Sequence, residues 1–248
     1  ITYITKSKLQ RAAILINLKE FIKTELKGWK KQEIIGLSIV FAIVFVNALV
    51  VKDNIIAVIS AVCGILYTII AGKGKISCYL FGITSTFCYS WLSYDNGLCG
   101  NLFLNMCYYL PMQIAGIFEW KKHLKKETKE IIKTTLPLKE RIIFCLIAAA
   151  ACTAAILLLY HLHDSSPVCD GITTVLSILG MYLTVKRCIE QWILWMVVNG
   201  LSMIMWFRLI MHGTKAYSTF IMWSVYFILA IYFYIQWSKD IKKTGTSK

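Results

Sequence analysis

Residues 53–72 read DNIIAVISAVCGILYTIIAG, and after Asp53 this stretch holds no charged side chain. A helix needs about 20 mostly apolar residues to cross the hydrocarbon core of a bilayer, because each residue advances it by about 1.5 Å. The stretch has that length. It therefore predicts a helix that spans a membrane rather than a helix of a soluble core.

Further apolar stretches of similar length lie on both sides of this one. The chain of 248 residues is 58% hydrophobic and only 16% charged, whereas soluble domains carry about 25% charged residues. A soluble enzyme, a secreted disulfide scaffold and a disordered chain are therefore excluded. We predict an all-α polytopic membrane protein with eight transmembrane helices, over residues 33–51, 53–72, 74–93, 97–120, 141–160, 167–185, 189–211 and 214–237.

The net charge of +14 is distributed unevenly along these helices. If the eight helices alternate in direction, 24 of the 27 Lys and Arg residues fall on one side, and only Lys52, Arg208 and Lys215 fall near the other. An excess of basic residues on one side is typical of the cytoplasmic face. The charge therefore predicts that both termini are cytoplasmic and that the basic face contacts anionic membrane lipids, with no nucleic-acid partner.

Two segments of the chain match each other when the sequence is shifted by 116 to 117 residues. Gly64 then meets Gly180, Thr68 meets Thr184, and Trp120 meets Trp237. Each copy holds three predicted spans and one span lies between the copies, so both copies enter the bilayer in the same direction. This is the arrangement of parallel three-helix repeats joined by an inversion helix, as in SWEET transporters.

The repeats predict the following domain organisation. Residues 1–32 form an amphipathic arm on the cytoplasmic membrane surface, for which a frayed, solvated arm is the alternative. The remaining parts are an extra transmembrane helix at 33–51, repeat 1 at 53–120, a basic linker and inversion helix at 121–160, repeat 2 at 167–237, and a basic cytoplasmic tail at 238–248.

Residue patterns that carry catalysis are missing from the sequence. There is no GxSxG, HExxH or Walker motif, and no CxxC pair. His161 and His163 are two residues apart, so on a helix their side chains point in nearly opposite directions and cannot share a metal ion. We expect no enzymatic activity, no metal and no cofactor. Cys99 and Cys169 both fall near the non-cytoplasmic face, which leaves a disulfide open.

Acidic residues are also missing from the middle of the predicted spans. Asp95, Glu119, Asp170 and Glu190 all fall near span ends. A transporter coupled to protons or sodium usually places an acid near the midplane. The sequence therefore favours transport without ion coupling.

One face of span 189–211 carries the first set of candidate binding residues. Trp192, Trp195 and Asn199 stand at positions i, i+3 and i+7, within an arc of about 60° on a helix. Asn199 is close to the middle of this span. The alternatives are an interfacial anchor for Trp192 and an interhelical hydrogen bond for Asn199.

Span 97–120 carries a second polar set at spacing four, which consists of Asn101, Asn105, Tyr109 and Gln113. Counted from the cytoplasmic ends, Gln113 lies at about the depth of Trp195 and Tyr109 at about the depth of Asn199. An unpaired amide in hydrocarbon costs several kcal/mol. We therefore expect the two sets to face each other across a cavity.

Aromatic rings and amides without a buried carboxylate suit a flat polar solute that is neutral or carries a delocalised cation. The faces of Trp rings attract cations, and Asn and Gln pair with carboxamides or sugar hydroxyls. A nucleotide would require an inward-facing cluster of Arg residues, which the spans do not have. Nucleosides and vitamins fit this pattern, and phosphorylated compounds do not.

Two motifs resemble one known family. The segment EQWILWMVVN, with Trp192, Trp195 and Asn199, is similar to the signature of the bacterial nicotinamide riboside transporter family (PnuC). The run GLCGNLFLNMCYYLPMQIAGIFEWKKH, from Gly97 to His123, resembles that family's other characteristic stretch. The resemblance covers roughly residues 33–240.

The resemblance implies a SWEET-like fold and facilitated diffusion of unphosphorylated nicotinamide riboside across the bacterial inner membrane. Direction would come from phosphorylation by a cytoplasmic riboside kinase. Trp192, Trp195 and Asn199 would bind the solute, with Asn105 and Gln113 as partners from the other repeat. Transport of thiamine, riboflavin or another flat vitamin, and a membrane sensor or receptor of another class, stay open, as does a homo-oligomeric state.

Overall fold

The computed structural model describes residues 29, 31–51, 54–95, 99–126, 128–163, 166–213 and 217–244. The predicted arm over residues 1–32 lies almost wholly outside this set. The chain divides into two compact units, Ile1–Val40 and Phe41–Lys248, each of which is treated by itself.

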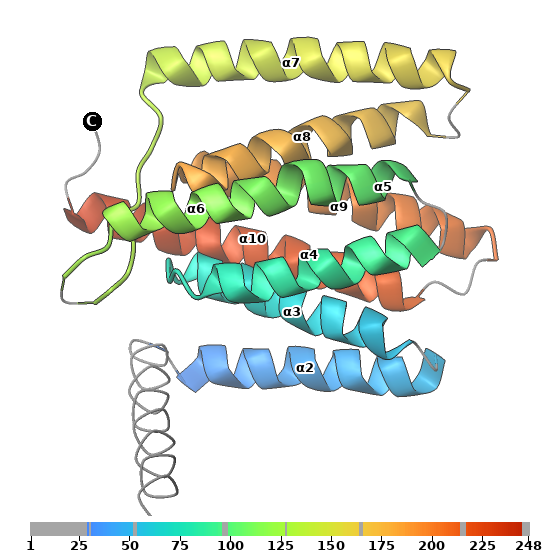
Figure 1. Cartoon of the computed structure of the whole chain (residues 1–248), viewed down its shortest axis with the longest axis horizontal. Coiled ribbons are helices and arrows are strands. Elements are labelled where there is room, and N and C mark those ends of the chain that lie inside the picture. The colour runs from blue at the N-terminus through green and yellow to red at the C-terminus, as the bar shows by residue number, and fades with distance from the viewer. Residues whose placement is uncertain are drawn as a thin grey trace, which may run out of the picture. The chain divides into compact units, whose positions relative to one another are not determined.

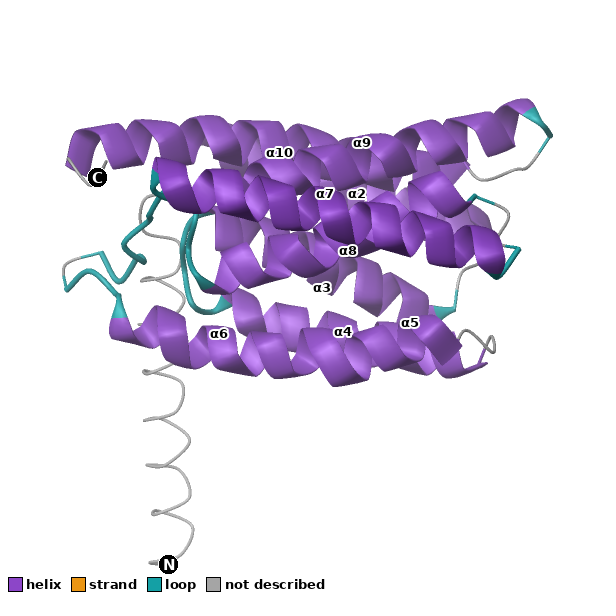
Figure 2. Cartoon of the chain, turned by 90° about the horizontal axis from the view of Figure 1, so that it is seen from above, coloured by secondary structure: helices purple, strands orange, loops and turns teal. Residues whose placement is uncertain are grey.

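The described residues form helices and loops, without a strand (Figure 2). Their bounds agree with the predicted spans to within a few residues at most ends. The helices are α2 (Lys31–Val51), α3 (Ile55–Gly72), α4 (Cys78–Asp95), α5 (Cys99–Leu104), the π-helix η1 (Asn105–Tyr109), α6 (Leu110–Lys122), α7 (Leu138–His161), α8 (Pro167–Val185), α9 (Glu190–Met211) and α10 (Tyr217–Thr244) (Figure 1).

Five of the described helices, α3, α7, α8, α9 and α10, are long and apolar enough to cross a membrane. Helix α4 has Ser, Thr and Tyr along its length, and α6 has only 13 residues because a π-helix precedes it. The described part of the chain is therefore all-helical, as in a multi-pass membrane protein. These five helices lie within five of the eight predicted spans or overlap them.

The stretch predicted as one span at 97–120 is interrupted by the π-helix η1. Pro111 lies in the first turn of α6 and has no N–H to bond to the preceding turn. The backbone N–H of Leu110 donates to the carbonyl of Asn105, five residues back, which is the π-helical pattern. The wider turn changes the direction of every side chain that precedes it, so the even spacing of four from Asn101 to Gln113 does not keep one face.

Two turns of the bundle have the same backbone geometry and relate the two halves of the chain. Gly74 ends the turn after α3 and Arg187 ends the turn after α8, both with positive φ, of 72° and 62°. Gly74 and Arg187 are 113 positions apart, whereas the residues matched in the predicted repeats are 116 to 117 positions apart. Helix α9 has 22 residues and α4 has 18. The additional helical turn in α9 increases the offset between the two predicted repeats from 113 to 117, which is the offset between Trp120 and Trp237.

The basic segments of the bundle lie together at one end, on the left in Figure 1. Here the linker between α6 and α7 contacts both turns: Ile131 N–H donates to the Gly74 carbonyl, and Thr134 N–H donates to that of Arg187. We call this the basic end, formed by residues 73–75, 121–126, 128–137, 186–187 and 238–244. The Cys169 thiol, in the first turn of α8, is free, so the disulfide that the sequence left open is not formed.

Candidate functional site

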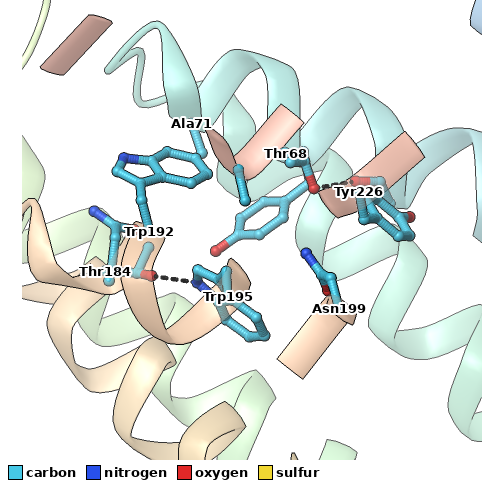
Figure 3. Close-up of a pocket in the computed structure, with 11 residues that line it drawn as sticks. Thr68, Ala71, Thr184, Trp192, Trp195, Asn199 and Tyr226 are labelled. Carbon is cyan, nitrogen blue, oxygen red and sulfur yellow. Dashed lines mark hydrogen bonds between the residues drawn. The ribbon is translucent and has the colours of Figure 1, made fainter. Parts of the chain in front are cut away.

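A cavity of about 200 Å³ lies between helices α3, α8, α9 and α10 (Figure 3). It is therefore bounded by the first helix of the predicted repeat 1 and by all three helices of repeat 2. Eleven residues line it: Gly64, Tyr67, Thr68, Ala71, Thr184, Gln191, Trp192, Trp195, Asn199, Tyr226 and Ala230.

Helix α9 supplies one wall of the cavity through residues at helical spacing. Trp192, Trp195 and Asn199 all line it, as their i, i+3, i+7 pattern predicts for one helix face. Trp192 is 3% exposed and packs on Phe233 and Trp237, with ring centroids 5.3 and 5.7 Å away. Its Nε1 is buried and has no hydrogen-bond partner among the described residues.

The Trp195 ring lies against Gly180 of α8. A Cβ at Gly180 would approach the ring to 3.2 Å, so only a small residue leaves the indole this position. The hydroxyl of Thr184 donates to the Gly180 carbonyl at 2.9 Å and lies 3.5 Å from the Trp195 Nε1. Close packing against α8 therefore holds one of the two cavity-lining indoles in place.

Helices α3 and α10 supply the opposite wall, which the sequence analysis did not predict. The Tyr226 hydroxyl packs against Gly64, where an added Cβ would lie 2.8 Å from the hydroxyl oxygen. Thr68 donates to the Gly64 carbonyl at 3.0 Å, and the Tyr67 hydroxyl lies 3.7 Å from the Sδ of Met181. A signal was present, because Tyr67 and Thr68 are polar side chains inside an otherwise apolar span.

The second predicted set, on 97–120, does not line this cavity. Asn101 is exposed, and Asn105 is buried but donates to the Asn101 carbonyl at 2.8 Å. Tyr109 lies beside Ser177 of α8. Gln113 donates to the Thr86 hydroxyl at 2.7 Å, and its Oε1 has no partner among the described residues.

The cavity lining carries no formal charge, because none of its eleven residues is acidic or basic. The nearest carboxylate in the sequence, Glu190, is engaged elsewhere: it accepts hydrogen bonds from Thr135 and the Leu136 N–H and pairs with Arg141 at 2.8 Å. Aromatic rings, hydroxyls and two amide side chains, those of Gln191 and Asn199, therefore make up the polar chemistry of the site. They suit a small polar solute without a compact negative charge.

A bundle of apolar, membrane-length helices with an aromatic-lined cavity between them is typical of a membrane transporter. The chain belongs to the family described as nicotinamide mononucleotide transporter, whose family model matches residues 54–239.

Individual relatives agree with this membership. The chain is 34% identical to the nicotinamide riboside transporter PnuC of Neisseria mucosa, over 87% of this chain and 84% of that protein. It is 29% identical to the PnuC of Haemophilus influenzae, over 88% of this chain and 94% of that protein. A crystal structure described as the vitamin B3 transporter PnuC superposes with a TM-score of 0.76 at 33% identity, over 89% of this chain and 97% of that one.

Proposed function

We propose that this protein carries nicotinamide riboside across the bacterial inner membrane by facilitated diffusion. The observation that carries the proposal is the uncharged, aromatic lining of the cavity. A pyridinium ring is flat and carries a delocalised positive charge, so it is attracted to the faces of Trp and Tyr rings. The names of the relatives point to the same solute.

The lining favours the riboside over the mononucleotide that the family description names. A phosphate group carries a compact negative charge, and burying an unpaired ion costs far more than burying a hydroxyl. Phosphate sites in proteins therefore use Arg, Lys or a helix N-terminus. No basic side chain lines the cavity, so a phosphate there would stay uncompensated.

Each part of the solute has a matching group in the cavity. Trp195 offers a ring face to the pyridinium, and the mostly buried Trp192 ring borders the same space. Asn199 is buried and has both a donor and an acceptor for the carboxamide or for ribose hydroxyls. Tyr67, Thr68 and Tyr226, on the opposite wall, add hydroxyls for the ribose.

The same features support uniport by alternating access. No acid lines the cavity to carry a coupled proton, so the solute equilibrates, and phosphorylation by a cytoplasmic riboside kinase would trap it inside. We assign eight spans, two SWEET-like repeats and cytoplasmic termini from the charge distribution and the paired turns at Gly74 and Arg187. The basic end is then the cytoplasmic end.

A competition panel tests the choice of solute. Purified protein is titrated by calorimetry with nicotinamide riboside, its mononucleotide, thiamine and riboflavin. We expect the riboside to bind at least about 10-fold more tightly than the mononucleotide, because the added phosphate finds no partner. Equal or tighter binding of the mononucleotide would contradict the assignment, and preference for thiamine or riboflavin would replace it.

A further inference from the structure

The cavity ends one turn short of the basic end of the bundle. Ala71 and Thr184 line it near the ends of α3 and α8, which finish at Gly72 and Val185. The Phe233 ring lies directly against Gly72, where a Cβ would approach the ring to 2.3 Å. Phe233 is 2% exposed. A layer of tightly packed aromatic side chains therefore separates the cavity from the basic end.

Two buried indoles in this layer each join a helix of one predicted repeat to a helix of the other. Trp120, on α6, donates from Nε1 to the Thr184 carbonyl at 2.9 Å, and Trp237, on α10, donates to the Gly72 carbonyl at 2.7 Å. Both acceptors belong to the last turn of a helix, where carbonyls have no partner within the helix. Each bond therefore joins the last helix of one predicted repeat to the first helix of the other.

Arg187 adds a third connection across the same layer. Its Nη1 donates to the Ile132 carbonyl at 2.9 Å, and its Nη2 lies 3.7 Å from the Glu119 carboxylate on α6. Burial lowers the pKa of this guanidinium, and Glu119 opposes that shift. Arg187 has φ of 62°, which side chains with a Cβ rarely adopt, while the matching turn after α3 has Gly74 there. Arginine therefore occupies a position that suits glycine, and its side chain contacts the other repeat.

We propose that Trp120, Trp237 and Arg187 form the gate that closes the solute cavity at the basic end. The proposal rests on the proposed transport function, because alternating access requires a pathway that is closed at one end while the other end opens. Opening the basic end breaks both indole–carbonyl bonds and separates Arg187 from Glu119. The three residues do not line the cavity, so they act on access and not on the solute itself.

Accessibility of a cavity position tests this gate. Ala71→Cys places a thiol in the lining beside Gly72, and an impermeant, cationic thiol reagent is applied to inside-out and to right-side-out membrane vesicles. Peptide mass spectrometry reads position 71 separately from the native cysteines. Adding Trp120→Phe and Trp237→Phe keeps two aromatic rings but removes both N–H donors. We expect labelling from the side of the basic end to become about 10-fold faster or more, which reflects two lost buried hydrogen bonds.

The control is Trp91→Phe, since Trp91 is exposed and lies near the end of α4 that is remote from the turn at residues 73–75. It should leave the labelling rate as in the parent. A rate unchanged by the double substitution, or raised equally from both sides, would overturn the gate. Protection of position 71 by nicotinamide riboside is read in the same samples. Missing protection would count against the proposed solute, whereas the rates still test the gate.

Arg187→Gly separates a gate from a merely structural contact. Glycine adopts φ of 62° without strain, so the backbone of the turn is relieved while the connection to Glu119 is lost. We expect faster labelling from the basic end with an unchanged or higher melting temperature. A lower melting temperature with an unchanged labelling rate would show that Arg187 only holds the fold together and would remove it from the gate.

Discussion

Trp195 contributes to the cavity through the face of its ring, which packs on Gly180 from one side. Trp195→Ala removes that face. Loss of an aromatic–cation contact of about 1–2 kcal/mol predicts a solute affinity about 5- to 30-fold weaker. Calorimetric titration measures the affinity, and Trp91→Ala, at an exposed position outside the cavity, should bind as the parent does. Unchanged affinity in Trp195→Ala would place the solute elsewhere.

Asn199 is the amide side chain closest to the middle of α9, and it is buried. Asn199→Leu keeps a similar volume but leaves a polar group of the solute unpaired, so we expect binding to weaken by about 1–3 kcal/mol. A melting curve accompanies each titration. If Asn199 instead only joins helices, the variant melts earlier and its folded fraction binds normally.

Among the described glycines, Gly116 of α6 has the side chain of another helix packed closest against it. A Cβ there would lie 2.2 Å from the Tyr79 hydroxyl oxygen and 2.3 Å from its ring carbon. Gly116→Ala should therefore destabilise the protein by about 1–3 kcal/mol through overpacking. Gly36→Ala, also within a helix, is the matched control, because a Cβ there would meet nothing within 4 Å. Similar melting temperatures for both variants would contradict the packing described for Tyr79.

Local spacing predicted only part of this site. Trp192, Trp195 and Asn199 belong to one helix, so their common face follows from 3.6 residues per turn. Tyr67 and Tyr226 belong to helices that are distant in the sequence, and their positions depend on how α3 and α10 pack against α9. That packing depends on small residues such as Gly64, whose close contact with Tyr226 has no signature in the sequence alone.

Glu190 connects the first turn of helix α9 to the linker before α7 through hydrogen bonds. Its Oε1 accepts from Thr135, from the Leu136 N–H and from Arg141. Glu190→Gln removes the charge that strengthens these bonds, so we expect a loss of about 1–2 kcal/mol in stability. Glu140→Gln, at an exposed position, serves as the control in the same melting experiment. Equal melting temperatures for both variants would show that the carboxylate charge is not needed.

Helix positions were predictable, whereas helix irregularities were not. Runs of apolar residues located α3, α7, α8 and α9 within a few residues, because span length is set by the bilayer, whereas α10 continues past the predicted end at 237 to Thr244. The π-helix at Asn105–Tyr109 was missed, although Pro111 indicated an interruption. The prediction aligned α3 with α8 by matching Gly64 to Gly180, which are identical residues. The turns at Gly74 and Arg187 give an alignment of the two helices that differs from it by about one helical turn.

The orientation of the whole molecule is tested by labelling from outside the cell. The basic linker, which includes Glu130, contacts both turns of the basic end, and 24 of 27 Lys and Arg residues share its predicted side. Under the positive-inside rule, Glu130→Cys should stay protected from an impermeant reagent in intact cells, while Asn96→Cys reacts. The reverse pattern would invert the topology and move the proposed gate to the outer face.

The central claim is that the molecule lets nicotinamide riboside equilibrate across the membrane without storing it. Purified protein in liposomes is given labelled riboside, with and without an imposed proton or sodium gradient. Since no acid lines the cavity, we predict uptake that stops when the internal concentration equals the external one, with or without a gradient. Accumulation above the external concentration under either gradient, or uptake no faster than into protein-free liposomes, would contradict the account.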